Sequence, residues 1–147
     1  MSRIISYKGI IDMDTEERIS LATIKGKVGY KINKFQLLSS TPGATAAVEY
    51  VGKITKVKDT NISPAVDFTN GDLLAVVYYQ DHDSSANPDS KTIIFDNEKF
   101  NQDIFVNITD AAGGTIPGNY YIELETMSLS DIEATQITLK SLRTVKQ

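Results

Sequence analysis

Apolar and polar residues alternate along several segments of this 147-residue chain, with the period of two that is typical of β-strands. In 104–109 the isoleucines and valine share one face, and in 119–127 Tyr120, Ile122 and Leu124 do the same. Clusters of Gly, Pro, Asn and Asp separate such segments at short spacing, as in all-β sandwiches and barrels. The pattern predicts an all-β protein, an antiparallel β-sandwich of jelly-roll type with about eight strands, built from residues 1–147 as a single domain.

Two features locate turns and bends in the first third of the chain. Segment 18–24 alternates and ends at Lys25-Gly26-Lys27, so we expect the chain to reverse there into 28–37. Within 28–37 the apolar positions change parity near Asn33 and Lys34. One extra residue in a strand moves every later side chain to the other face, so the sequence predicts a β-bulge at this point.

The middle of the chain contains a strong hairpin signal. Asn70-Gly71 stands between 66–69 and 73–79, and both residues tolerate a positive φ, so we expect a two-residue hairpin. Segment 73–79 is apolar at every position, which indicates a strand buried on both faces. Residues 80–91 are polar and rich in turn formers, and are expected to form an exposed loop. Further strands are expected at 46–57, 92–95, 104–109 and 119–127.

The period changes to that of a helix near the end of the chain. Ser130 and Glu133 have the spacing of a capping box, and apolar residues then recur at helical spacing. The sequence therefore predicts a helix over about 131–143. Its apolar stripe would dock against a neighbouring surface, with Leu139 and Leu142 as expected partner contacts.

Composition excludes several classes of function. The chain has no cysteine, which removes disulfides, thiolate metal sites and cysteine nucleophiles, and its single histidine removes tri-histidine metal sites. Its net charge is −4, so nucleic acid is not an expected partner. The apolar run 73–79 is far shorter than the roughly 20 residues that cross a bilayer, and the N-terminal residues do not resemble a signal peptide. We therefore expect neither a membrane partner nor export by a signal peptide.

Charge is unevenly distributed along the chain. Residues 1–60 carry ten Lys or Arg and six acidic residues, a net charge of +4, whereas residues 61–147 carry five and thirteen, a net charge of −8. Opposite charge in two separate regions would favour association with charged partners or with other copies of the chain. The alternative is that interleaved strands mix the two halves in space.

One loop holds the residues that a metal ion would prefer. Asp81, Asp83 and Asp89 lie close together in the sequence with His82 and Asn87, and carboxylate and amide oxygens are calcium ligands. The loop lacks the ligand spacing of an EF-hand, and a solvated polar loop is the commoner explanation. No nucleophile motif accompanies His82, so the group does not indicate acid–base catalysis.

Glu123 and Glu125 raise the question of a glycosidase, which needs two facing carboxylates about 5 to 10 Å apart. Carboxylates two residues apart approach that range, but an exposed sheet face is the ordinary setting for such a pair. We therefore predict no catalytic residue and no cofactor.

Two tyrosine pairs are candidate contact residues. Adjacent strand positions face opposite sides, so one ring of Tyr78-Tyr79 and one of Tyr120-Tyr121 should enter the core while the other faces solvent or a partner. Tyr78 and Tyr120 are the rings that we predict to contact a partner.

The last third of the chain carries a family resemblance. Over about 45 residues from Gln102, an Asn-Tyr-Tyr-x-Glu-Leu-Glu strand at 119–125 is followed by a helix whose residues 134–140 read Ala-Thr-x-x-Thr-Leu-Lys. This pairing resembles the C-terminal part of small virion-associated structural proteins of tailed phages that infect marine bacteria. The resemblance implies a structural role in a viral particle, and therefore localisation in the virion.

Together these features predict a non-enzymatic structural protein of a tailed-phage virion. We expect a decoration, fibre-like or knob-like component of the head surface, assembled as a homo-oligomer with a trimer as the first expectation. Its partners would be other copies of itself and the major capsid protein or other virion proteins, and host-surface polysaccharide is a further candidate. Three alternatives stay open: a carbohydrate-binding β-sandwich module, a hydrolase using Glu123 and Glu125, and a tail or neck component of the virion.

Overall fold

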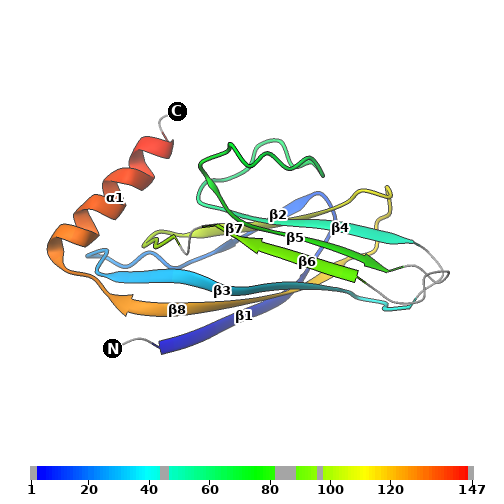
Figure 1. Cartoon of the computed structure of the whole chain (residues 1–147), viewed down its shortest axis with the longest axis horizontal. Helices are drawn as coiled ribbons and strands as arrows, with labels where there is room; N and C mark the ends of the chain where they lie inside the picture. The colour runs from blue at the N-terminus through cyan, green and yellow to red at the C-terminus, as the bar shows by residue number, and fades with distance from the viewer. Residues whose placement is uncertain (1–2, 44–46, 82–88, 96–97, 146–147) are drawn as a thin grey trace.

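The computed structural model describes residues 3–43, 47–81, 89–95 and 98–145, with all their side chains except those of Asp89 and residues 141–145. These residues form eight strands and one helix (Figure 1). In chain order they are β1 (Arg3–Ile11), β2 (Thr15–Ile19), β3 (Val28–Ser39), β4 (Val48–Thr55), β5 (Leu73–Asp81), β6 (Asp89–Ile94), β7 (Ile104–Asp110), β8 (Gly118–Ser128) and α1 (Asp131–Val145).

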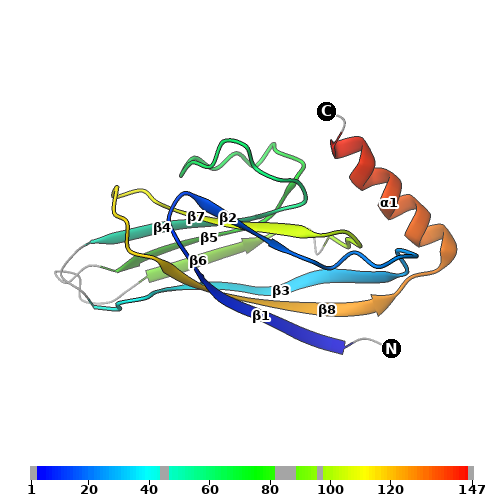
Figure 2. The same ribbon diagram turned by 180° about the vertical axis from the view of Figure 1, so that it is seen from behind.

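The strands make two antiparallel sheets, which lie as two layers in Figures 1 and 2. The small sheet has the order β1-β8-β3, and the large sheet has the order β2-β7-β4-β5-β6. The strands pair as in a long hairpin that has been rolled up, with the first strand beside the last. Strand β1 pairs with β8, β2 with β7 and β4 with β5. The fourth pair, β3 beside β6, is joined by the Thr92 hydroxyl, which donates to the Phe35 carbonyl at 3.0 Å. This order is that of a jelly-roll β-sandwich, and the predicted fold is confirmed.

The core lies between the inner faces of the two sheets. On β7 the residues Ile104, Val106 and Ile108 are fully buried, and on β8 Ile122 and Leu124 are too. Burial of one such side chain stabilises the fold by about 1.5–3 kcal/mol. The alternation read from these two segments therefore gives the correct inner face of each strand.

Strand β5 is buried on both sides, as its uninterrupted apolar run predicts. Val77 faces the core, and Val76 on the other face is only 7% exposed. The connection 56–72 lies over this outer face (Figure 1), and the Lys53 ammonium donates to the carbonyls of Ser63 and Ala65 within it. Burial lowers the pKa of Lys53.

The predicted bulge in β3 is also confirmed. Pairing of β3 with β8 shifts register between Ile32 and Lys34. Tyr30 and Ile32 face the core before this point, and Phe35 and Leu37 face it afterwards. The extra residue keeps both halves of a twelve-residue strand in contact with the same core.

The predicted hairpin at Asn70-Gly71 is wrong. Residues 66–69 form no strand, and Phe68 is 59% exposed. The side-chain oxygens of Asp67 and Asn70 instead accept hydrogen bonds from the backbone of their own loop. Strand β5 instead pairs antiparallel with β4, which precedes it across the connection 56–72.

The predicted reversal at Lys25-Gly26-Lys27 does not form a hairpin either. Strand β2 ends at Ile19 and pairs with β7 in the large sheet, whereas β3 belongs to the small sheet. Residues 20–27 therefore cross from one sheet to the other, with Leu21 buried on the way. Strand β1 was not among the predicted strands.

Helix α1 begins as the capping box predicts. The Ser130 hydroxyl accepts from the Glu133 N–H at 3.2 Å, and the Glu133 carboxylate accepts from the Ser130 N–H at 3.3 Å. The helix meets the sandwich through small and polar groups: Ala134 is buried, and the Asn101 amide donates to the Thr138 hydroxyl at 2.9 Å. No helix in the described part of the chain is long and apolar enough to span a bilayer.

Asp103 fixes the start of the crossing segment. Its Oδ1 accepts from the N–H groups of Leu21 and Ala22 at 2.7 and 2.8 Å, and its Oδ2 accepts from Nε of Arg18 at 2.6 Å. Burial acts to raise the pKa of Asp103, but these donors outweigh burial and hold the pKa below its usual value. The ionised carboxylate therefore stabilises the folded state.

We predict that Asp103→Asn lowers the free energy of unfolding by about 2 kcal/mol at neutral pH, since bonds to a charged acceptor are lost. The unfolded carboxyl has a pKa of about 3.9. Because the folded pKa is lower, the stabilisation is present above about pH 4 and is lost as the pH falls through the folded pKa. Urea unfolding of both proteins between about pH 6 and about pH 3 should show the difference shrinking.

Arg18→Gln is the matched control for this series. It removes the exposed partner and leaves both backbone donors, so it should cost about 1 kcal/mol or less. A constant difference between wild type and Asp103→Asn across the pH range would contradict this account of Asp103.

Candidate interaction surface

The outward side of the small sheet carries exposed apolar side chains. Ile4 is 53% exposed, Ile10 is 59% exposed and Leu38 is 50% exposed. In Figures 1 and 2 this side is the underside of the sandwich, and no described helix or loop packs on it. We call it the outer face of the small sheet, and it comprises Ile4, Ser6, Lys8 and Ile10 of β1, Asn119, Tyr121, Glu123 and Glu125 of β8, and Lys31, Lys34, Gln36 and Leu38 of β3.

Strand register arranges these side chains in rows across the sheet. Charged rows lie toward one end, where Lys31 and Lys34 of β3 stand opposite Glu125 and Glu123 of β8. The Lys31 ammonium lies 3.9 Å from the Glu125 carboxylate. Uncharged rows lie toward the other end, where Leu38 and Ile10 flank β8.

These rows show how charged residues from the two halves of the sequence, 1–60 and 61–147, are arranged relative to each other. Basic residues of β3 alternate in space with acidic residues of β8, and Lys56 pairs with Glu98 at 2.6 Å. At these positions of the described chain the two halves are therefore interleaved. The outer face of the small sheet therefore combines both signs of charge with separate exposed apolar side chains.

Glu123 and Glu125 both lie on this outer face. The Tyr121 hydroxyl donates to the Glu123 carboxylate at 3.3 Å, and the Asn33 amide donates to the Glu125 carboxylate at 3.4 Å. Both carboxylates are thus engaged with neighbours on the same sheet. This geometry does not place a substrate cleft between two facing carboxylates, as a glycosidase requires.

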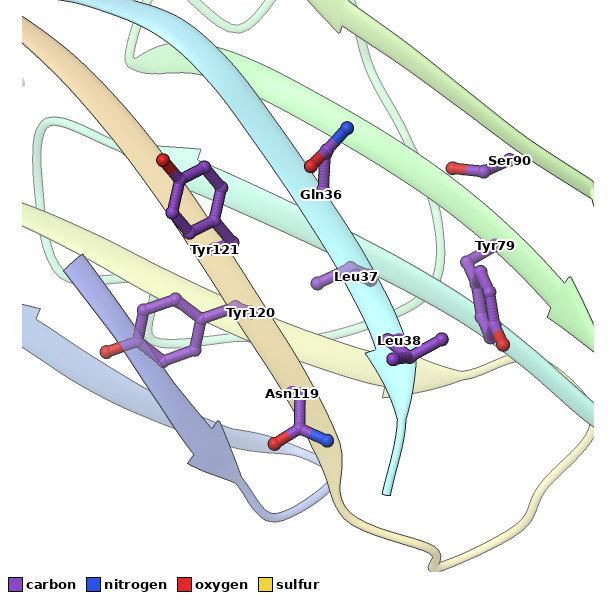
Figure 3. Close-up of a pocket in the computed structure, with 8 residues that line it drawn as sticks. All are labelled: Gln36, Leu37, Leu38, Tyr79, Ser90, Asn119, Tyr120 and Tyr121. Carbon is purple, nitrogen blue, oxygen red and sulfur yellow. The ribbon is translucent and has the colours of Figure 1, made fainter. Parts of the chain in front are cut away.

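A cavity of about 450 Å³ lies at the edge where β3 approaches β5 and β6 (Figure 3). Its residues come from both sheets, and the Tyr79 hydroxyl lies 3.2 Å from Asp81. Burial and this nearby carboxylate raise the pKa of Tyr79, which keeps the hydroxyl protonated. Neither Glu123 nor Glu125 lines the cavity, which is formed by Gln36, Leu37, Leu38, Tyr79, Ser90, Asn119, Tyr120 and Tyr121.

The tyrosine pairs are split between core and surface as expected, but one residue was assigned wrongly. Tyr79 and Tyr120 are each 4% exposed, whereas Tyr78 and Tyr121 are half-buried. Tyr120 points from β8 toward β1 (Figure 3), and burial beside Glu17 raises its pKa. Tyr121 is therefore the accessible ring of its pair, and the choice of Tyr120 as a partner contact is corrected.

The apolar residues predicted for the stripe of α1 are exposed where the structure describes them. Leu139 is 48% exposed and Ile132 is 72% exposed, because the helix contacts the sandwich with the side that carries Ala134 and Thr138. The side chain of Leu142 lies outside the described residues. Leu139 is thus accessible to a partner, as required of a contact residue.

The predicted metal ligands are only partly described. Asp81 is 5% exposed, at the end of β5, so its assignment to an exposed loop is wrong. Its carboxylate accepts from the N–H of Gly43 at 2.8 Å and thereby fixes the turn after β3. Asp83 and the side chain of Asp89 lie outside the described residues, and within the rest of the chain no three acidic or histidine residues converge on one point.

The β1 side chains of the outer face were missed in the sequence. Residues 4–11 contain paired isoleucines at each end, so neither parity is purely polar and the period of two is hidden. High β-propensity without glycine or proline over Ile4 to Tyr7 was the signal available. No protein-family model and no curated protein sequence matches this chain.

We predict unequal losses of stability for substitutions of two neighbouring tyrosines on β8. Tyr120→Ala should lower the free energy of unfolding by about 3–5 kcal/mol, because it leaves a cavity in the core. Tyr121→Ala should cost about 1 kcal/mol or less, because that ring is accessible. Urea unfolding monitored by circular dichroism measures both, and equal losses would contradict the assigned faces.

Proposed function

We propose that this protein is a non-enzymatic structural component of a tailed-phage virion. In this proposal it sits on the head surface as a decoration, fibre-like or knob-like protein and assembles as a homo-oligomer. The observation that carries the proposal is a jelly-roll sandwich in which no described element covers the outer face of the small sheet. That face carries exposed isoleucine and leucine side chains. Jelly rolls recur in viral capsid proteins, and an uncovered apolar face is a typical site for contact with another protein.

The resemblance in the last third of the chain supports the same role. The matching residues are 119–125 and 134–140, which lie in β8 and α1. Strand β8 is the middle strand of the small sheet, so the resemblance falls on the element that supports the proposed contact face. Leu139 is a further exposed apolar residue and lies on the helix.

Recognition would depend on fitting surfaces together. Many weak contacts with the major capsid protein, or with other virion proteins, add up when copies are arrayed on a particle. The interleaved charges of β3 and β8 would then select the partner, since like charges placed opposite one another are unfavourable.

Electron microscopy of purified phage particles, with gold-conjugated antibody against this protein, tests the proposal. We expect gold on the head surface at many positions per particle. Gold confined to the tail or neck would favour the alternative position within the virion. Particles that carry no gold, together with absence of the protein from their mass spectrum, would rule out a virion role.

A carbohydrate-binding module is the second candidate, and the cavity beside Tyr121 favours it. Lectins also use the jelly roll, and this cavity combines an aromatic ring with the amides of Gln36 and Asn119. Titration of bacterial polysaccharides followed by calorimetry should then show saturable binding that Tyr121→Ala weakens about tenfold or more. Tyr78→Ala, on the other sheet, is the matched control, and an absence of any saturable heat excludes this function.

A further inference from the structure

The exposed edge of β1 is unlike the other sheet edges of this protein. Edge strands offer unpaired backbone groups to other chains, and proteins usually protect them with charges, bulges, prolines or a covering element. Strand β1 pairs with β8 over nine consecutive residues without a register shift. Among the described residues, no backbone hydrogen bond joins β1 to any element other than β8.

The other three edges are β2, β3 and β6, and β6 is only six residues long. Strand β2 has five residues, and three of them, Glu16, Glu17 and Arg18, are charged. Strand β3 is interrupted by the bulge at Asn33 and is bridged to β6 by Thr92. Only β1 is long, regular and almost uncharged between Ile4 and Ile11.

We propose that β1 pairs edge to edge with β1 of a second copy of this chain, in an antiparallel register centred on Tyr7. The two small sheets then form one continuous six-stranded sheet across a two-fold axis. The inference deepens the proposed function and rests on it, because it names the surface through which copies of the virion component meet.

The register follows from the side chains on the two faces of β1. A two-fold axis at Tyr7 places Ile4 of each copy opposite Ile10 of the other, and so covers the two most exposed apolar residues of the strand. An axis at Ser6 would place Ile4 opposite Lys8, and an axis at Lys8 would place Ile10 opposite Ser6. Only the register at Tyr7 pairs apolar with apolar at both ends.

The inner face of β1 fits the same register. Ile5 and Tyr7 are half-buried and pack on the margin of the core. With the axis at Tyr7, Ile5 of one copy lies opposite Gly9 of the other, and Gly9 has no side chain because the Tyr120 ring occupies that space. Pairing therefore completes the burial of Ile5 and Tyr7 without a clash at Gly9.

Charges on the outer face also match. Lys8 of the second copy stands opposite Ser6, and Ser6 is the neighbour of Glu123 on β8. The small Ser6 side chain leaves Lys8 and Glu123 about 10 Å apart at their Cβ atoms, two strand spacings, which their long side chains can span. Each dimer thus gains two such pairs.

This pairing is isologous, so it closes with two copies and replaces the trimer expected from the sequence. Sedimentation velocity should give twice the 16.2 kDa mass of one chain. Ile10→Lys should shift the protein to the mass of one chain. Ile93→Lys is the matched control on β6, 45% exposed, and should leave the dimer intact.

A charge exchange tests the pairing of Lys8 with Glu123. Lys8→Glu should weaken association about tenfold, and Lys8→Glu combined with Glu123→Lys should restore it. Circular dichroism melts verify that each variant is folded, and both positions face outward, so the fold should persist.

Cysteine cross-linking tests the register itself, on a background without native cysteine. An equimolar mixture of Ser6→Cys and Lys8→Cys chains should form a disulfide under mild oxidation, because residues 6 and 8 face each other. Neither variant alone should do so, since its cysteines lie diagonally, roughly 7–8 Å apart. Cross-linking of either variant alone would place the axis elsewhere and overturn the register.

Other outcomes separate this inference from the proposed function. A wild-type protein that sediments as one chain, or as three, overturns the β1 pairing, whereas gold on phage heads would still support the virion role. Gold-free particles would remove that role, even if the dimer forms with the expected cross-link.

Discussion

The burial of two inner sheet faces against each other is the interaction on which the other features of this protein depend. Each strand has only two faces, so the residues that fill the core also fix which side chains point outward. On β8, burial of Ile122 and Leu124 commits Tyr121 and Glu123 to the surface. The composition of the open face is therefore a direct consequence of core packing, and a change of register by one residue would exchange the two.

The jelly-roll order also determines where sheet edges occur. Nesting the first strand against the last leaves β1 at one margin of the small sheet, beyond any other described strand. On the opposite margin the Thr92 hydroxyl of β6 donates to the Phe35 carbonyl of β3 and so joins the two sheets. Within the described residues, the small sheet is thus joined to the large sheet at its β3 margin and ends in an unpaired edge at β1.

Three charged side chains, of which Lys53 and Asp81 are buried and Asp103 is half-buried, hold connections between strands. Asp103 holds the segment that crosses between the sheets, Asp81 holds the turn after β3, and Lys53 holds the long connection between β4 and β5. Each bonds to backbone groups that the sheets leave unpaired, which is the usual requirement for burying a charge. The donors around Asp103 lower its pKa, whereas burial itself lowers the pKa of Lys53, so both shifts are consequences of folding.

The sequence by itself determined the features that depend on neighbouring residues. These are the inner rows of β7 and β8, the bulge in β3, the burial of β5 and the capping box of α1, because a period or a cap is set within a few residues. Only the tertiary structure decided that β2 joins β7, that β5 returns to β4 across 56–72, and that β1 pairs with β8. Such pairings join residues as distant as Arg3 and Thr126, and they are chosen by the burial of whole sheet faces, which no local pattern encodes.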